Sequence, residues 1–370
     1  MSFIITILAA LLVFSAVIAI HEFGHFTVAK LCGIQVNEFS IGMGPVLWKK
    51  NHKGTQYSLR ALPVGGFVAL EGEESPESQQ AEAVHTVQEQ PAPETEAPVQ
   101  PTGIPLNEAP VWQRALVMVA GAVMNFVLGF VVLVILIAAQ NEPITSKTIY
   151  AIQDGALCGQ TGLQAGDQVL AVNGRRCFVA NDILYELVRT QSYSADFTVL
   201  RDGKKVQLPG VQFDTWQDEK GETHMSIGFS VYGLEKTPGN VLREAGNSVL
   251  YYGRIVFTSL IDLLRGRESI NNLSGPVGIV TAIGQAASYG WQDLLELLAL
   301  ITINLGIFNL LPFPALDGGK VVFLIIEGIT GRAVPEKLQS ALTVAAFGLL
   351  FALMLFATYN DIIRLVTGAM

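Results

Sequence analysis

The sequence is poor in cysteine, histidine and charge. Its 370 residues include three cysteines and five histidines, and charged residues make up only 15% of the chain. Cys32, Cys158 and Cys177 fit neither a disulfide framework nor a CxxC zinc motif. Cys158 and Cys177 could pair, but free cysteines are often small buried residues, and we expect two buried thiols. No basic patch is present, which argues against a nucleic-acid partner.

A net negative charge is also absent from most of the chain, because acidic and basic residues balance outside one segment. The net charge of −9 arises in residues 71–110, which hold nine Glu and no Asp, Lys or Arg. Residues 72–110 also hold seven of the sixteen prolines, with many Gln and Ala. Such a segment buries too little apolar surface to offset the entropy lost on folding. We therefore expect a disordered acidic linker over 72–110.

Apolar residues, in contrast, are abundant: half of the chain is hydrophobic and the mean hydropathy is +0.42. Four stretches are long enough to cross a bilayer, at 3–20, 115–139, 294–316 and 338–358. The first could be a signal peptide, but no Lys or Arg precedes it and HEFGH follows it in place of small residues. We expect a retained membrane helix. The composition predicts a polytopic membrane protein.

Basic residues between the spans indicate an orientation. The loop 30–114 is rich in Lys and Arg, whereas the first twenty residues have none. By the positive-inside rule this loop lies in the cytoplasm and both termini lie outside. Arg332 and Lys337, between the last two spans, agree with this orientation. The arginines within 243–267, which would lie outside, argue against it.

The segments between the spans have their own patterns. Residues 34–70 alternate in polarity, which predicts a β-hairpin with Gly65-Gly66 at a turn or bulge. Residues 146–235 contain turns, alternating strands and an amphipathic helix at 181–190, a pattern that resembles a PDZ domain. A PDZ domain binds a peptide as an added strand. Residues 239–268 read as an amphipathic helix on the membrane surface.

The expected fold is a polytopic α-helical membrane protein of about four transmembrane helices, with a cytoplasmic membrane-associated β-hairpin and one extracytoplasmic PDZ-like α+β domain. The expected segments are a first transmembrane helix (1–31), the hairpin region (32–71), the linker (72–110), a second transmembrane helix (111–140), the PDZ-like domain (146–235), the surface helix (239–268) and a C-terminal membrane region with two transmembrane helices (269–370).

His21, Glu22 and His25 form an HExxH motif at the end of the first span. On a helix, residues four apart differ by about 40° around the axis, so His21 and His25 can bind one metal ion. Glu22 can take a proton from a water molecule that zinc activates for attack on a peptide carbonyl. Chance matches to this motif usually fall in polar segments. Three ionisable groups closing an apolar span are costly in lipid and indicate function.

A catalytic zinc needs a third protein ligand. The other histidines lie in segments expected to be soluble, which leaves Glu296, Asp317 and Glu327 in the later spans. Asp317 is favoured because it follows NLLPFPALDGG, where two prolines interrupt an apolar helix. Irregular backbone at membrane depth is tolerated where it lines protein or a water-filled cavity. Alternatively, Asp317 caps a helix beginning at Gly318, a role compatible with metal binding.

Together, HEFGH, LPVGGFV, the PDZ-like segment, SGPVGIV and NLLPFPALDGG resemble the site-2 protease family of intramembrane zinc metalloproteases, in its bacterial RseP-like branch. The likeness covers nearly the whole chain apart from 72–110. It implies a Zn2+ enzyme of the bacterial cell membrane that performs regulated intramembrane proteolysis. Its substrates would be transmembrane segments of pre-cleaved proteins, such as anti-sigma factors or remnant signal peptides.

The resemblance also implies roles for individual residues. Asp317 is the third zinc ligand, and Asn309 holds the substrate or its oxyanion. An edge strand formed by Gly65, Gly66, Phe67 and Val68 receives the unwound substrate. Two departures from the family are visible: RseP has tandem PDZ domains where this chain has room for one, and AGAVMN (120–125) lacks a proline, which leaves Asn125 as a less certain substrate contact.

Two other functions would account for part of the sequence. A membrane-tethered PDZ scaffold would carry a degenerate HExxH, whereas here the motif and Asp317 are intact. A metal transporter also uses intramembrane His and Asp, but it needs neither a Glu beside His21 nor an external peptide-binding module. For the PDZ-like domain, peptide capture and exclusion of substrates with bulky outer domains both stay open, and exclusion is preferred.

Overall fold

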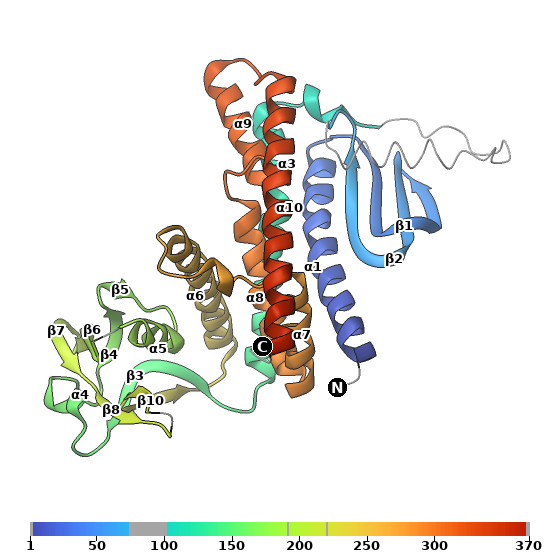
Figure 1. Cartoon of the computed structure of the whole chain (residues 1–370). Coiled ribbons are helices and arrows are strands. Elements are labelled where there is room, and N and C mark those ends of the chain that lie inside the picture. Colours follow the sequence, from blue (N-terminus) through green and yellow to red (C-terminus); the bar gives the residue numbers. More distant parts are fainter. Residues whose placement is uncertain (1–2, 74–101, 191, 220, 368–370) are drawn as a thin grey trace, which may run out of the picture. The chain divides into compact units, whose positions relative to one another are not determined.

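The computed structural model describes residues 3–73, 102–190, 192–219 and 221–367 (Figure 1). The chain divides into two compact units, which we call unit 1 (Met1–Val132 with Val256–Met370) and unit 2 (Leu133–Ile255). Among the described residues, four helices are long and apolar enough to cross a membrane. They are α1 (Phe3–Leu31), α3 (Val111–Ala139), α8 (Trp291–Asn309) and α10 (Glu336–Thr367). Each overlaps one of the expected spans.

The third of these helices ends earlier than the apolar run predicts. α8 stops at Asn309, and the chain then turns irregularly before α9 (Asp317–Thr330) begins. A further helix, α7 (Pro276–Tyr289), precedes α8. α7 and α9 have 14 residues each, short of the roughly 20 that cross a bilayer. α9 begins one residue before the helix expected at Gly318, whereas α7 was not predicted.

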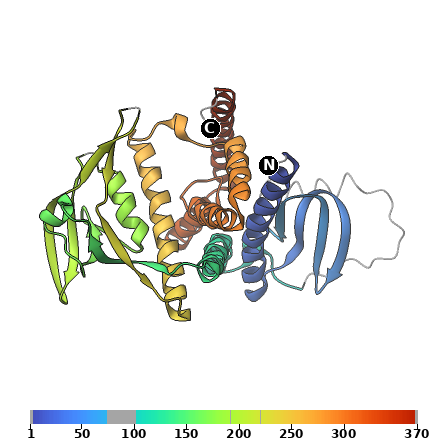
Figure 2. The ribbon, with the colours of Figure 1, turned by 90° about the horizontal axis from the view of Figure 1, so that it is seen from below.

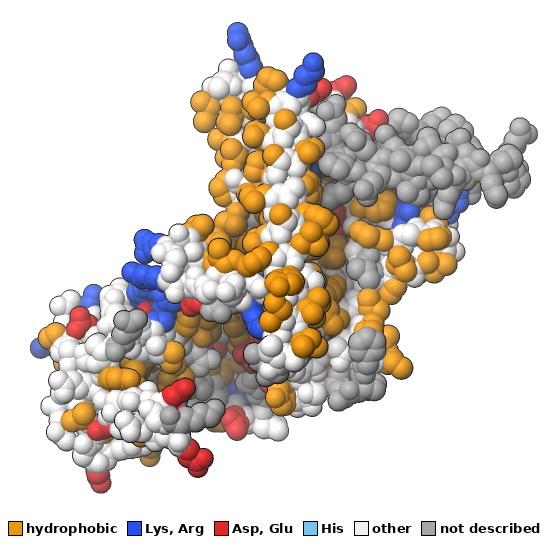
Figure 3. All heavy atoms as spheres, in the orientation of Figure 1, with side chains coloured by type: hydrophobic (Ala, Val, Ile, Leu, Met, Phe, Trp, Pro, Cys, Tyr) orange, Lys and Arg blue, Asp and Glu red, His pale blue; other side chains and the backbone are white. Residues whose placement is uncertain are grey.

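The helices of unit 1 expose many large apolar side chains. Those of α10 form an apolar surface that Figure 3 shows along the helix. Exposed members include Leu342, Val344, Phe347, Leu349 and Phe351. A continuous apolar surface of this kind would be unfavourable in water, and contact with lipid accounts for it.

The expected hairpin is present as β1 (Val36–His52) and β2 (Thr55–Leu70), and it packs beside α1 (Figure 2). The hairpin turn falls at Lys53-Gly54, where both residues have positive φ. β2 bends so that both of its arms pair with the first half of β1: Phe39 pairs with Tyr57 on one side and with Val68 on the other. Gly65, with φ +81°, lies at the bend. The turn-or-bulge prediction for Gly65-Gly66 is therefore met by a bend within β2.

The expected linker 72–110 extends too far at its C-terminal end. Residues 74–101 lie outside the described part of the chain, but residues 102–110 are folded. Ile104 forms a bridge with Ile34, and Leu106 begins a short 3-10 helix, η1 (Leu106–Glu108). Leu106 and Ala109 are buried against the end of α1 and the start of β1. Composition alone could not predict this, because a few apolar residues are enough to order the segment when they pack against residues that are distant in the sequence.

Unit 2 contains a six-stranded antiparallel sheet in the order β10-β3-β4-β6-β7, with β5 paired to β4. Its strands are β3 (Ile144–Ile152), β4 (Gln168–Val172), β5 (Arg175–Arg176), β6 (Ser194–Arg201), β7 (Lys204–Gln212) and β10 (Phe229–Leu234), accompanied by a separate hairpin of β8 (Asp214–Gln217) and β9 (Thr223–Ser226). The helices are α4 (Leu157–Gln160), α5 (Ala180–Val188) and the first part of α6 (Pro238–Leu264).

The local predictions for this unit are confirmed. An Asn173-Gly174 turn joins β4 to β5 and an Asp202-Gly203 turn joins β6 to β7, with positive φ at all four residues. α5 covers the predicted amphipathic stretch and buries Ile183 and Leu187 in the core of the unit. Cys158 and Cys177 are buried free thiols. Burial raises the pKa of the Cys177 thiol to about 11, so it is protonated at neutral pH.

Candidate active site

The two histidines of HExxH lie on the buried side of α1. His21 and His25 are 9% and 8% exposed, and their Nε2 atoms are 3.2 Å apart. His25 Nδ1 lies 2.8 Å from the backbone oxygen of Val117. A carbonyl oxygen can only accept, so Nδ1 carries the hydrogen and donates it. This tautomer leaves the Nε2 lone pair available for a metal ion.

The carboxylate of Asp317, from the C-terminal part of unit 1, lies beside the two histidines. Its Oδ2 atom lies 3.2 Å from His21 Nε2 and 3.4 Å from His25 Nε2. Ligand atoms bound tetrahedrally at zinc distances of about 2.05 Å are about 3.3 Å from one another. Oδ2 is buried and has no hydrogen-bond donor. An acceptor without a donor, set against two imidazole nitrogens at this spacing, fits a zinc ion.

The turn between α8 and α9 delivers Asp317 to this position. The chain folds back so tightly that a Cβ on Gly318 would lie 2.2 Å from the Leu311 oxygen, and one on Gly319 would lie 2.3 Å from the Phe313 oxygen. Only glycine fits at these two positions. Asp317 is the first residue of α9, with Leu316 at the N-cap, so the alternative of Asp317 as the cap itself is not what the backbone shows.

Two ion pairs fix α9 within unit 1. Lys320 Nζ lies 2.7 Å from Glu73 Oε1, and Arg114 at the start of α3 pairs with Glu327. Glu327, one of the three carboxylates considered as a ligand, is thus engaged with Arg114. Glu296, another, does not belong to the ligand group formed by His21, His25 and Asp317.

α3 approaches the histidines closely because it carries small residues. A Cβ on Gly121 would lie 2.4 Å from His25 Nε2 and 2.6 Å from His21 Cε1. On the α1 side, a Cβ on Gly24 would lie 2.4 Å from the Ala120 oxygen. These two glycines let the backbones pack against each other at the level of the ligands.

Two asparagines contact His21. Asn125 Nδ2 is 3.2 Å from His21 Nδ1, and Asn309 Nδ2 is 3.4 Å from both ring nitrogens. Asn125 is fully buried, and its Oδ1 atom has no hydrogen-bond partner. Asn309 is 9% exposed, at the last position of α8.

Glu22 points toward the hairpin. A Cβ placed on Gly66 would lie 3.8 Å from Glu22 Cγ, so β2 passes directly beside this side chain. Phe67 and Val68 follow Gly66 in the arm that pairs with Ser40 and Phe39 of β1. In the described residues, no further strand pairs with the outer edge of this arm.

The structure thus brings His21, His25 and Asp317 together, with Asn125 and Asn309 against His21 and Gly66 beside Glu22. The sequence reading missed Gly121 and the Val117 carbonyl. The run of small residues around Gly121 (AGAVMN) was a signal of close helix packing. A backbone carbonyl carries no sequence signal, so the partner of His25 could be found only in three dimensions.

Comparison with known proteins gives one consistent result. The pattern of peptidase family M50 matches residues 9–353. The regulator of sigma-W protease RasP from Bacillus subtilis is 29% identical over 98% of this chain and 99% of its own length. A putative zinc metalloprotease from Clostridium perfringens is 33% identical over 96% of this chain and 98% of its length. With a ligand group that suits zinc at the HExxH motif, the chain belongs to peptidase family M50 and is a membrane zinc metalloprotease.

Proposed function

We propose that this protease cuts within transmembrane segments of membrane proteins that have already lost their outer domains. The observation that supports the proposal most directly is the ligand group of His21, His25 and Asp317, buried among helices of membrane-spanning length. A protease built in this way acts where its substrates are helical and lipid-embedded. The name of the Bacillus relative refers to sigma-W regulation, which supports anti-sigma factors as one substrate class; signal-peptide remnants are a second.

Each residue of the site has a distinct task in this proposal. His21, His25 and Asp317 hold zinc, which when bound acidifies water and polarises the scissile carbonyl. Glu22 is outside the ligand group and accepts the proton from the attacking water. The same carboxyl group then donates the proton to the leaving amine. The Val117 carbonyl keeps His25 in the metal-binding tautomer.

Asn125 and Asn309 differ in exposure, and this suggests different roles. Because Asn125 is fully buried behind His21, we assign it to orientation of the ligand. With its amide turned over, the unpartnered Oδ1 accepts from His21 Nδ1–H and leaves Nε2 for zinc. Asn309 keeps some exposure at the end of α8 and is assigned to the substrate or its oxyanion.

The outer edge of Gly65, Gly66, Phe67 and Val68 is the proposed substrate site. A helical segment cannot present its carbonyls to water until it unwinds. Pairing with this edge would hold the unwound chain extended beside Glu22, since Gly66 lies against that side chain.

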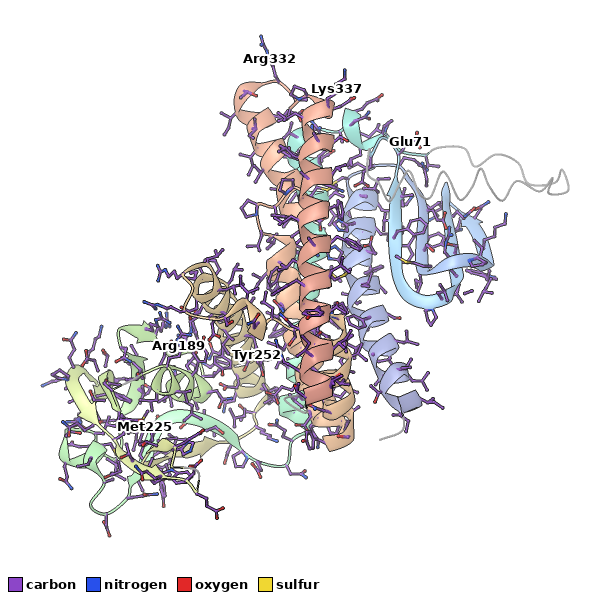
Figure 4. The ribbon with its side chains drawn as sticks, in the orientation of Figure 1. Glu71, Arg189, Met225, Tyr252, Arg332 and Lys337 are labelled. Atoms are coloured by element: carbon purple, nitrogen blue, oxygen red, sulfur yellow. The ribbon has the colours of Figure 1, made fainter. Side chains whose placement is uncertain are left out.

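We also propose an orientation of the chain in the membrane. Arg332, between α9 and α10, and Lys337, in the first turn of α10, lie at the same end of unit 1 as Glu71 (Figure 4), as expected if this end faces the cytoplasm. Unit 2, with the PDZ-like sheet, is then extracytoplasmic. In a chain without its three native cysteines, a cysteine at position 204 should react with an impermeant reagent in intact cells, and one at position 88 should not. The opposite result would reverse the orientation.

The cleavage proposal is tested with purified full-length protein and a single-span peptide in detergent or nanodiscs. Mass spectrometry of the products should locate the cut inside the apolar segment, and Glu22→Gln should give no products. Cleavage confined to the flanking polar residues would contradict the assignment.

A further inference from the structure

Unit 2 contains a cavity of about 340 Å³ that the proposed proteolysis does not use. It is bounded by β3, by the segment from Arg176 to Val179 that leads into α5, and by the first turns of α6. Its volume is at the lower end of the range of small-ligand sites, which is roughly 300–1,000 Å³.

The cavity is lined by an excess of positive charge. Lys147 of β3, Arg176 of β5 and Arg243 of α6 face it, whereas Glu244 is its one carboxylate. Burial raises the pKa of the Glu244 carboxyl, which favours its neutral form. Burial also lowers the pKa of the Lys147 ammonium.

The cationic side chains of the cavity keep N–H donors that can bind a ligand. Lys147 Nζ donates to the Cys177 carbonyl over 2.6 Å, which uses one of its three N–H bonds and fixes the ammonium at the wall. Arg176 is stacked on Phe178, with Cζ 5.6 Å from the ring centroid. Within the described part of the chain, neither Arg176 nor Arg243 has a carboxylate partner. Two guanidinium groups without carboxylate partners, next to an ammonium group, can donate hydrogen bonds to an anion with several oxygens, such as a phosphate.

The surface next to the cavity is apolar. On α6, Leu242 and Leu250 are 51% and 53% exposed, and Leu234 at the cavity wall is 42% exposed. Leu250 and Arg243 are seven residues apart and therefore differ by about 20° around the helix axis. An exposed leucine thus lies two turns above a cavity arginine on one face of α6. A ligand with a charged head and an apolar tail would match both.

We propose that this cavity binds a phosphate group, with an anionic phospholipid as the source that fits the adjoining leucines. The headgroup would lie between Arg176, Lys147 and Arg243, and an acyl chain would follow α6 past Leu250. Unit 2 would then hold a lipid directly. This site involves no residue of the zinc centre.

The test uses full-length protein in detergent, with native mass spectrometry of bound phosphatidylglycerol and thermal shifts with inorganic phosphate. Arg176→Gln/Arg243→Gln should weaken phosphatidylglycerol binding by about tenfold or more, since two charge-assisted contacts are lost. Lys204→Gln/Lys205→Gln removes the same charge from exposed positions of β7 and should bind as the unaltered protein does.

A second variant separates loss of binding from misfolding. Glu244→Gln removes the only carboxyl group among the described residues that line the cavity, and it should bind phosphatidylglycerol at least as tightly as the unaltered protein. Phosphatidylglycerol binding that weakens in the arginine double variant but not in the lysine double variant supports the lipid as the source of the phosphate. Binding of inorganic phosphate alone, with the same pattern, supports the phosphate site with a soluble source. Binding that is equal in the arginine and lysine variants overturns the proposal, as does a cavity that responds only to acidic peptides.

Discussion

At the scale of single residues, the zinc site depends on the absence of a side chain at position 121. A Cβ there would come within 2.4 Å of His25 Nε2. Gly121→Ala should therefore displace the histidines and cause zinc to be lost, at a cost of about 1–3 kcal/mol in packing. Gly348→Ala in α10 is the matched control, because nothing lies within 4 Å of its Cβ position. That variant should keep its zinc and gain up to about 1 kcal/mol of helix stability. Equal zinc content in both would show that α1 and α3 are less closely packed.

Asn125 gives a second prediction at this scale. If it orients His21, Asn125→Leu should lower zinc affinity by about 10- to 100-fold, as loss of a partner behind a metal ligand generally does. Competition with a zinc chelator measures this directly. Asn309→Leu is the comparison: it should retain zinc and mainly lower cleavage. Unchanged zinc affinity in Asn125→Leu would return Asn125 to the role of substrate contact.

The same residues show what the sequence could provide. HExxH predicts two of the proposed zinc ligands and the proposed base, because the helical period places His21 and His25 on one face. Asp317 lies 292 positions after His25. It could be predicted as a ligand because the neighbouring prolines and glycines indicate an interrupted helix at membrane depth. Val117 acts through its carbonyl and Gly121 through the side chain it lacks. Neither property can be deduced without knowing which helices touch.

At the scale of elements, α6 is attached to the sheet domain of unit 2 through Arg254. Its guanidinium donates to Asp182 and to the Arg176 carbonyl, and it lies 3.9 Å from Glu186. Asp182 is fully buried and accepts the Val179 N–H at the start of α5 over 2.9 Å. One arginine therefore joins α6 to α5.

Removing that arginine should loosen both helices. Arg254→Met leaves Asp182 buried without its counter-charge, a change that typically costs about 3–5 kcal/mol. Hydrogen exchange of the α5 amides in the full-length protein should accelerate by about a hundredfold to several thousandfold, given a factor of ten per 1.4 kcal/mol. Arg265→Met, an exposed charge just beyond α6, should change exchange little. Unaltered protection in Arg254→Met would mean that apolar packing alone holds α6.

The ends of strands could be predicted where a turn requires particular residue types. Asn173-Gly174 and Asp202-Gly203 mark the ends of strands through their positive φ. Helix α7 was not predicted because its 14 residues are too short to cross a bilayer, whereas α9 begins within one residue of the helix expected at Gly318. Leu106 and Ala109 were missed because their partners, Ile34 and Val36, lie about 70 residues earlier, beyond any local pattern.

At the scale of the whole molecule, unit 2 stands in the chain between α3 and the helices that lead to Asp317. We expect it to exclude substrates that retain bulky outer domains. Replacing 148–232 by a short Gly/Ser linker should leave cleavage of a clipped substrate intact and raise cleavage of the unclipped form towards it. Both are measured with one substrate made with and without its outer domain. Discrimination that survives the replacement would place the filter elsewhere, for instance in α6.

We propose that His21, His25 and Asp317 hold zinc while Glu22 moves the proton, and zinc content measured together with cleavage tests these roles most directly. Glu22→Gln should retain about one zinc per chain and lose cleavage by about 10²–10⁴-fold or more, because it removes the base without removing a ligand. Asp317→Ala should lose both zinc and cleavage, and a chelator should abolish cleavage by the unaltered protein until zinc is restored. Full zinc occupancy in Asp317→Ala, or undiminished cleavage by Glu22→Gln, would contradict the account.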